Sequence, residues 1–279
     1  MDSAPPGGVS AIHPTALVAE GASIGPGVTV GPYCTVGPAV TLEEGVRLVS
    51  HVVVEGRTRI GAGATLFPFC TVGLAPQDLK YRGEDTAVEI GPRTLVREHC
   101  SIHRGTASGA GVTRIGADCM LMAVVHVAHD CALGDGVIVS NNVVMGGHVV
   151  IGDHAVIGGA AAIHQFVHIG RGAMINGVTG IPADVIPFGR ASGNHGRLVG
   201  LNVVGMRRRG FDDAAIMAAR RAFRFLFLGP GVFAERVKEA RARFGGEPVV
   251  GEILDFIEHP GRRGLVTTDP GALATDIGA

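Results

Sequence analysis

The chain has 279 residues, 44 of them glycine and 15 proline, and it contains no tryptophan. This length predicts one large domain or two smaller ones, while 46% hydrophobic residues argue against disorder and irregularly spaced glycines exclude collagen. The net charge of −1 hides 12 basic against 4 acidic side chains within residues 187–243, a balance that could attract phosphates, an acidic protein or nucleic acid.

Residues 1–11 are expected to be a short lead into the first structured element. They lack the basic stretch and apolar core of a secretory signal, and no run of about 18 apolar residues follows anywhere in the chain. We therefore expect a cytoplasmic protein with no integral membrane segment.

A six-residue repeat begins at Ile12. An apolar residue falls at every sixth position from Ile12 to Val72, then from Ile90 to Ile102, and again from Ile115 to Ile181. The residue two positions earlier is usually small, and both positions face one interior because strand side chains alternate. Glycine often follows the apolar residue, where it can bend sharply or adopt a positive φ. The pattern predicts short strands joined by corners over residues 12–186, without crossover helices.

This pattern resembles the hexapeptide-repeat family, which implies a left-handed parallel β-helix of triangular section with 18 residues in each coil. The left hand follows from the resemblance alone, because parallel crossovers are otherwise right-handed. Two breaks in the repeat predict loops expelled near residues 74–89 and 103–114. All five cysteines occupy the small inward position, which predicts tight packing in a reducing compartment rather than disulfides or metal ligation.

Polar residues gather at one corner of this predicted prism. A coil of 18 residues stacks His129 and Asp130 beside Gly147 and His148, and then beside Gln165, with His164 adjacent. A histidine can act as a general base at neutral pH when a carboxylate orients it, and the Gly147 N–H can donate to a developing oxyanion. This arrangement predicts acyl transfer to an alcohol.

After residue 186 the apolar period becomes that of helices. Residues 187–265 are predicted to form a basic helical domain with three helices, of which FDDAAIMAARRAFRFLFL is the first. Residues 266–279 are predicted to be a flexible tail.

Seven motifs sharpen the family resemblance: QDLKY, IHRGT, HVAHDC, GGHV, IHQF, GNH and RRGF. Their order and spacing resemble those of the UDP-N-acetylglucosamine O-acyltransferases that open lipid A biosynthesis, over residues 11–265. The resemblance implies transfer of a 3-hydroxyacyl group from acyl carrier protein to the sugar 3-hydroxyl of UDP-N-acetylglucosamine. It also implies a homotrimer with sites between subunits, no cofactor, no metal and no nucleic-acid partner.

The same resemblance assigns roles to individual residues. His129 would be the general base, Asp130 its partner and Gly147 the oxyanion donor. The implied substrate-binding residues are Gln77, Asp78, Lys80, His126, His148, His164, Gln165, Asn202, Arg208 and Arg209. The implied acyl-chain pocket contains Ala173, Gly177 and His195, where small side chains favour a longer chain. The implied docking site for the acidic carrier contains Arg220, Arg221 and Arg224.

Other interpretations stay open. A related acyltransferase that modifies an amine shares the prism and the histidine, but it carries an N-terminal nucleotide-binding domain, whereas the repeat here starts at Ile12. A zinc enzyme like the gamma-class carbonic anhydrases would use three histidines, and His126, His129 and His148 match that spacing poorly. A non-enzymatic trimeric scaffold would leave the expelled QDLKY loop and the stacked histidines unexplained. The acceptor's 3-substituent, hydroxyl or amine, is also undecided.

Overall fold

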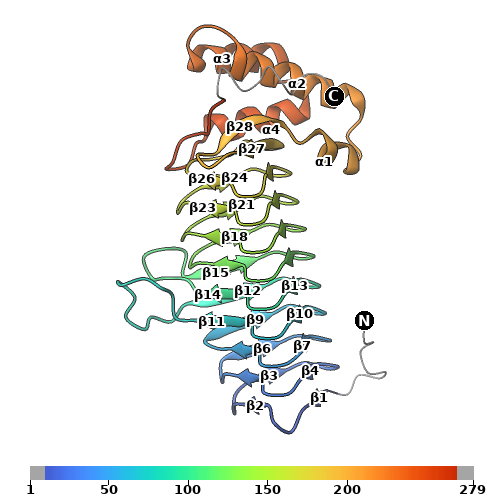
Figure 1. The fold of residues 1–279 in the computed structure, drawn as a ribbon, viewed down its shortest axis with the longest axis vertical. Coiled ribbons are helices and arrows are strands. Elements are labelled where there is room, and N and C mark those ends of the chain that lie inside the picture. The colour runs from blue at the N-terminus through green and yellow to red at the C-terminus, as the bar shows by residue number, and fades with distance from the viewer. Residues whose placement is uncertain (1–9, 269–279) are drawn as a thin grey trace.

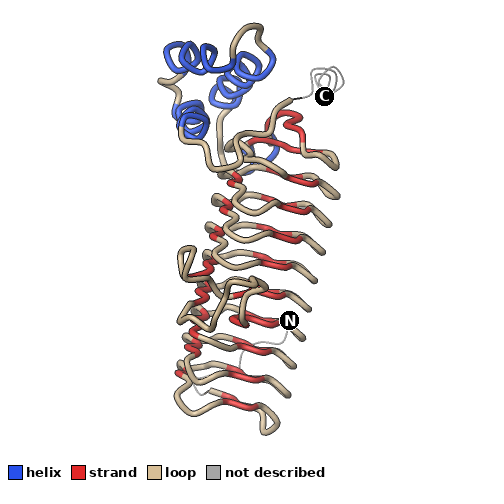
Figure 2. The backbone as a smooth tube through the Cα atoms, turned by 90° about the vertical axis from the view of Figure 1, so that its left-hand side faces the viewer, coloured by secondary structure: helices blue, strands red, loops and turns tan. Residues whose placement is uncertain are grey.

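A computed structural model describes residues 10–268, which form a tall triangular prism of coiled strands with helices at its C-terminal end (Figures 1 and 2). The described strands make three sheets, one on each face of the prism. The first sheet contains β1 (Ala11–Ile12), β4 (Thr29–Val30), β7 (Arg47–Leu48), β10 (Thr65–Leu66), β13 (Leu95–Val96), β16 (Met120–Leu121), β19 (Ile138–Val139), β22 (Val156–Ile157), β25 (Met174–Ile175), β27 (Gly189–Ser192) and β28 (Arg197–Leu201). The second contains β2 (Leu17–Val18), β5 (Thr35–Val36), β8 (Val53–Val54), β11 (Thr71–Leu74), β14 (Ser101–His103), β17 (His126–Val127), β20 (Val144–Met145), β23 (Ala162–Ile163) and β26 (Gly180–Ile181). The third contains β3 (Ser23–Ile24), β6 (Val40–Leu42), β9 (Arg57–Ile60), β12 (Ala87–Ile90), β15 (Val112–Ile115), β18 (Ala132–Leu133), β21 (Val150–Ile151) and β24 (His168–Ile169).

The strand register confirms a coil of 18 residues. His126 pairs with Val144, which pairs with Ala162, and both pairings, β17 with β20 and β20 with β23, are parallel and in step. The chain passes from the first sheet to the second, then to the third, so each coil has three corners. We name them by the sheets that they join: the 1–2, 2–3 and 3–1 corners.

Two long insertions leave the prism at the same corner. One connects β11 to β12 through residues 75–86, and the other connects β14 to β15 through residues 104–111. Both therefore lie at the 2–3 corner, where they project to the left from about the middle of the prism in Figure 1. They are a few residues shorter than the predicted 74–89 and 103–114, because the strands on either side extend further into these segments.

The interior is filled by the two inward positions of each hexad. Leu121, Ile157 and Ile175 are fully buried, and each such side chain contributes about 1.5–3 kcal/mol relative to an exposed one. All five cysteines are buried and free, as the small inward position predicts. The prism is thus a rigid support for its corners.

The glycines that follow the apolar position have a different reason from the predicted positive φ. Gly152 does not have a positive φ, but a Cβ there would lie 2.6 Å from the backbone nitrogen of Arg171 on the next coil. The positive φ falls later in the corner, at Asp130 (59°) and His148 (61°). Close approach between coils therefore requires glycine at the first position, and left-handed backbone forms the corner itself.

Helices cover the C-terminal end of the prism (Figure 1). They are α1 (Val203–Arg208), α2 (Asp213–Leu228), α3 (Phe233–Phe244) and α4 (Pro248–Glu258), so the described residues hold one helix more than predicted. Asp212 caps α2 by accepting the Ala215 N–H at 2.7 Å. No helix among residues 10–268 is long and apolar enough to span a bilayer.

The segment after α4 packs back onto the prism. Leu265 forms a β-bridge with Asp184, and Val266 is only 4% exposed. Residues 266–268, the start of the predicted flexible tail, are therefore packed. Residues 269–279, like residues 1–9 of the predicted lead, lie outside the described residues.

Candidate active site

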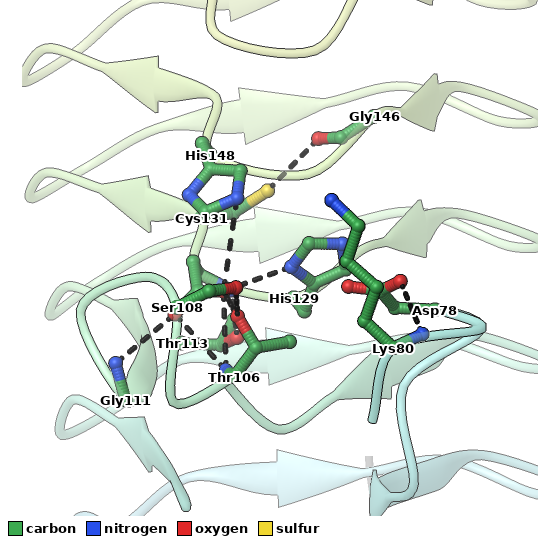
Figure 3. A network of polar contacts seen from close by, with 11 residues as sticks. Asp78, Lys80, Thr106, Ser108, Gly111, Thr113, His129, Cys131, Gly146 and His148 are labelled. Atoms are coloured by element: carbon green, nitrogen blue, oxygen red, sulfur yellow. Dashed lines mark hydrogen bonds and ion pairs between the residues drawn. The ribbon is translucent and has the colours of Figure 1, made fainter. Parts of the chain in front are cut away.

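The predicted polar corner exists as a stack on three successive coils. His129, Gly147 and Gln165 occupy the same place in the 2–3 corner, and the His148 N–H donates to the His129 carbonyl at 3.0 Å. Both insertions leave this corner on coils nearer the N-terminus. Figure 3 shows Asp78 and Lys80 from the first insertion on one side of His129 and Thr106 from the second on the other.

His129 and Asp130 form a hydrogen-bonded pair. The His129 Nδ1 lies 2.8 Å from the Asp130 Oδ2, and the Asp130 side chain is completely buried. An ionised carboxylate can only accept, so Nδ1 carries the hydrogen and Nε2 keeps a free lone pair. A neutral imidazole fixed in this way can accept a proton from a substrate hydroxyl.

The second insertion, residues 104–111, supplies the donors that hold Asp130. The Thr106 hydroxyl donates to Asp130 Oδ2 at 2.6 Å, and the Thr106 N–H lies 3.1 Å from both carboxylate oxygens. The Gly111 N–H donates to Oδ1 at 3.1 Å. Burial opposes the charged form, but the hydrogen bonds from Thr106 and His129 outweigh it and lower the pKa of Asp130. Asp130 therefore stays ionised.

Gly147 presents its backbone directly to the His129 imidazole. A Cβ at this position would lie 2.5 Å from the His129 Cε1 and 2.6 Å from its Nε2. The Gly147 carbonyl accepts the Phe166 N–H, whereas the Gly147 N–H has no hydrogen-bond partner among residues 10–268. A free N–H beside the base is what an oxyanion donor requires.

A column of rings continues from His129 along the corner. His148 meets His129 edge to face at 5.0 Å, and Phe166 stacks on His148 at 4.4 Å. The Arg262 guanidinium lies over Phe166 at 4.7 Å. Burial lowers the pKa of His148, so this ring is neutral at pH 7. The sequence analysis did not find Arg262, and no periodicity links it to this corner.

A second histidine pair lies on the neighbouring strands β14 and β17 of the second sheet. His126 Nδ1 is 2.8 Å from the Ser101 Oγ, and burial lowers the pKa of His126. His103 meets His126 edge to face at 5.0 Å. Burial, followed by the neighbouring His126 and His129, lowers the pKa of His103 to about 4. His103 lies in the quoted IHRGT motif but was not predicted as a site residue.

His129 and His148 open into a groove of about 1210 Å³, whereas His103 and His126 do not line it. Six of the predicted residues line it: Gln77, Asp78, Lys80, His129, His148 and Gln165. The lining residues that were not predicted are Leu79, Ser108, Gly109, Ala110, Phe166, His168, Pro260, Gly261 and Arg262. Volume and lining suit a polar ligand larger than a simple sugar.

The other predicted substrate-binding residues do not line this groove. His164 is exposed, and its Nδ1 lies 3.2 Å from the Gln165 carbonyl oxygen. Asn202 is buried as the N-cap of α1, where its amide accepts from the Gly205 N–H and donates to the Gly172 carbonyl. Arg209 donates to the His154 carbonyl at 2.7 Å, which places it at the 3–1 corner, and Arg208 is exposed at the end of the same helix. Asn202 thus has a structural role that the sequence analysis did not predict.

The residues predicted to contact the acyl chain are not gathered in one place. Ala173 is fully buried in the prism interior, so it cannot line a pocket outside the prism. Gly177 is exposed at the 1–2 corner, and His195 is exposed between β27 and β28. Arg221 and Arg224, predicted to dock the carrier, are exposed on α2, and Arg220 beside them is partly buried.

His129, Asp130 and His148 are the group of possible metal ligands among residues 10–268, with ligand atoms within 4.8 Å of one another. Both Asp130 oxygens already accept hydrogen bonds, and His126, which the zinc interpretation requires, does not belong to this group. This donor set fits a hydrogen-bonded pair better than a three-histidine zinc site.

Fold and site together define a transferase of the hexapeptide-repeat class. Residues 21–56 and 112–147 match the family model described as bacterial transferase hexapeptide, and residues 184–266 match the second domain of UDP-N-acetylglucosamine O-acyltransferase. The acyl-(acyl-carrier-protein)–UDP-N-acetylglucosamine O-acyltransferase of Azorhizobium caulinodans is 51% identical over 96% of this chain and 99% of its own. That of Caulobacter vibrioides is 49% identical over 91% of this chain and 97% of its own.

Solved structures agree. A crystal structure of UDP-N-acetylglucosamine acyltransferase superposes with a TM-score of 0.89 at 39% identity, covering 92% of this chain and 99% of that one. The Campylobacter jejuni enzyme gives a TM-score of 0.87 at 37% identity over 92% and 99% of the two chains. The chain belongs to the UDP-N-acetylglucosamine O-acyltransferase family. Its β-helix is left-handed like theirs, as the resemblance implied.

Proposed function

We propose that this chain transfers a 3-hydroxyacyl group from acyl carrier protein to the 3-hydroxyl of UDP-N-acetylglucosamine, the first step of lipid A biosynthesis. The observation that carries the proposal is the buried His129–Asp130 pair, with its 2.8 Å contact, beside the free Gly147 N–H in a polar groove. Relatives of about half identity that carry this enzyme's name support it.

The geometry supports a role for three residues in the transfer. His129 Nε2 removes the proton from the sugar hydroxyl while that oxygen attacks the thioester carbonyl carbon, and Asp130 stabilises the resulting imidazolium. The Gly147 N–H donates to the oxyanion of the tetrahedral intermediate. Collapse breaks the carbon–sulfur bond, and the imidazolium returns its proton to the departing thiolate. All bonds and protons in these steps are accounted for without a metal or a cofactor.

Asp78 and Lys80 are positioned to bind the sugar nucleotide. Both line the groove beside His129, and the Asp78 Oδ1 accepts the backbone N–H of Lys80 at 2.9 Å, which fixes the turn between them. The exposed Lys80 ammonium is a suitable partner for a phosphate. Gln77 and Gln165 add neutral donors and acceptors for sugar hydroxyls.

The complete enzyme is a homotrimer with its sites between subunits. His129 lies at the 2–3 corner, whereas Arg209 contacts the 3–1 corner and Gly177 lies at the 1–2 corner. One protomer therefore cannot bring all the assigned residues to one substrate, and a second copy must supply some of them. Sedimentation at working concentration should give three chains, and a monomer that turns over normally would contradict a shared site.

The remaining assignments follow from surface and compartment. The exposed Arg221 and Arg224 on α2 offer positive charge to an acidic carrier, and salt should weaken that contact. Five buried, free cysteines suit a reducing cytoplasm. The exposed Gly177 has no side chain that would limit the length of the acyl chain, and this favours a longer chain.

One experiment tests activity, acceptor and acyl length together. Purified full-length protein is incubated with acyl-carrier thioesters of graded chain length and with either UDP-N-acetylglucosamine or its 3-amino analogue. The masses of the products are then measured by mass spectrometry. We expect an O-linked 3-hydroxyacyl product. No product with any donor, or stoichiometric zinc in the active protein, would overturn the proposal.

A further inference from the structure

The segment after α4 is anchored to the prism by one buried carboxylate. Asp184 is fully buried, and its carboxylate accepts the Gly261 N–H at 2.9 Å and the His168 N–H at 2.7 Å. Its backbone pairs with the same segment, through Gly264 at 2.7 Å and Val266 at 2.9 Å. Residues 260–264 are thereby fixed across the 2–3 corner, on the C-terminal side of Phe166.

Because Asp184 fixes this segment, Arg262 lies at the wall of the groove. The Arg262 guanidinium lies over the Phe166 ring, which stacks on His148, which in turn contacts His129. The next residue, Arg263, donates to the Gln165 carbonyl at 2.9 Å and pins the segment a second time. One contact at Gly261 and one at Arg263 therefore fix the backbone of Arg262 beside the stacked rings of Phe166 and His148.

The Arg262 charge has no ionic partner in the part of the chain that the structure describes. Its guanidinium forms no hydrogen bond or ion pair with any of residues 10–268, and its contact with a ring face leaves the N–H edges free. Apart from histidines, the groove is lined by one carboxylate, Asp78, and two cations, Lys80 and Arg262. An unpaired planar fork at a cationic groove matches a phosphate group.

We propose that Arg262 is a substrate-binding residue that contacts a phosphate group at the active-site groove. The inference rests on the proposed function, because both substrates of that reaction carry phosphate: the diphosphate of the nucleotide and the phosphodiester of the carrier's prosthetic group. The two sources share one chemistry, and kinetics can separate them.

The test compares Arg262→Ala with a matched control in the full-length protein. Arg243→Ala is that control, since Arg243 also lies over a phenylalanine ring, Phe225 at 5.3 Å, but on α3 and outside the groove. KM is measured for each substrate with the other saturating. Loss of a charge-assisted contact predicts a rise of about tenfold or more in one KM for Arg262→Ala, with kcat nearly unchanged. Arg243→Ala should leave both KM values unchanged.

The pattern of results identifies the phosphate. A rise in the KM for UDP-N-acetylglucosamine, with weaker binding of that nucleotide by calorimetry, assigns the diphosphate; a rise only for the acyl carrier assigns the prosthetic group. Arg262→Lys should recover little, because an ammonium lacks the fork. If wild type turns over and both KM values of Arg262→Ala stay within twofold of it, this inference fails alone. If wild type neither turns over nor binds the nucleotide, the proposed function fails and this inference with it.

Discussion

Replacing Gly147 with alanine tests the geometry of the catalytic corner. A Cβ at Gly147 would meet the His129 ring at 2.5 and 2.6 Å, against about 3.5 Å for an unstrained carbon contact. The backbone is held by the next coil, through the Phe166 N–H on the Gly147 carbonyl at 3.0 Å, so the imidazole must move by about 1 Å. A misplacement of about 1 Å at a reacting group costs about 10²-fold in rate. We therefore expect kcat to fall about 10²-fold.

The assay is steady-state transfer at saturating levels of both substrates. Gly159→Ala is the matched control: Gly159 occupies the equivalent place in the 1–2 corner, and a Cβ there would have its nearest contact at 3.4 Å. That variant should keep its kcat, which separates a local displacement from general damage to the prism. A Gly147→Ala enzyme that retains more than a third of the wild-type kcat would refute the reasoning.

Two further predictions concern stability and pH, measured by urea unfolding at fixed protein concentration because the protein is expected to be oligomeric. Thr106→Val removes the 2.6 Å hydrogen bond to Asp130, and the lowered folded pKa of Asp130 stabilises the protein above about pH 4. The variant should lose about 1.5–3 kcal/mol of unfolding free energy at pH 7, and this loss should shrink as the pH falls below about 4. An equal loss at all pH values would contradict this role of the hydrogen bond. His103 is 6% exposed with a folded pKa of about 4, so the unfolded chain gains a proton near pH 6.5 that the folded one does not, and acid destabilises the protein through this group. His103→Phe should remove up to about 2 kcal/mol of the stability difference between pH 7 and pH 5, and an unaltered difference would show that His103 does not titrate in this way.

The periodic part of the molecule could be predicted from the sequence because the coil repeats. Once each coil takes 18 residues, the stacking of His129, Gly147 and Gln165 follows from parallel strands in register. The same rule gave the inward position of the cysteines. It failed on the role of the glycines, because the distance between coils, rather than the backbone angle, decides whether a side chain fits at Gly152.

The non-periodic contributions could not be predicted. Thr106 and Gly111 reach Asp130 from an insertion whose conformation no repeat encodes. Arg262 reaches Phe166 across almost 100 residues through the Asp184 anchor, and such a contact leaves no pattern in the sequence. Asn202 caps α1, a helix that the sequence did not predict, so this structural role could not be predicted either. The repeat therefore predicts only part of the site, and the rest comes from a loop and from a segment that is distant in the sequence.

The most direct measurement of the central claim is the turnover of His129→Ala. The 2.8 Å pairing with Asp130 and the adjacent Gly147 support the proposed role of this imidazole as the general base, a role that accounts for about 10²–10⁴-fold in rate. We predict a fall of at least 10²-fold in kcat, with subunit assembly and UDP-N-acetylglucosamine binding preserved. A variant that assembles, binds the nucleotide and turns over within tenfold of wild type would contradict the account.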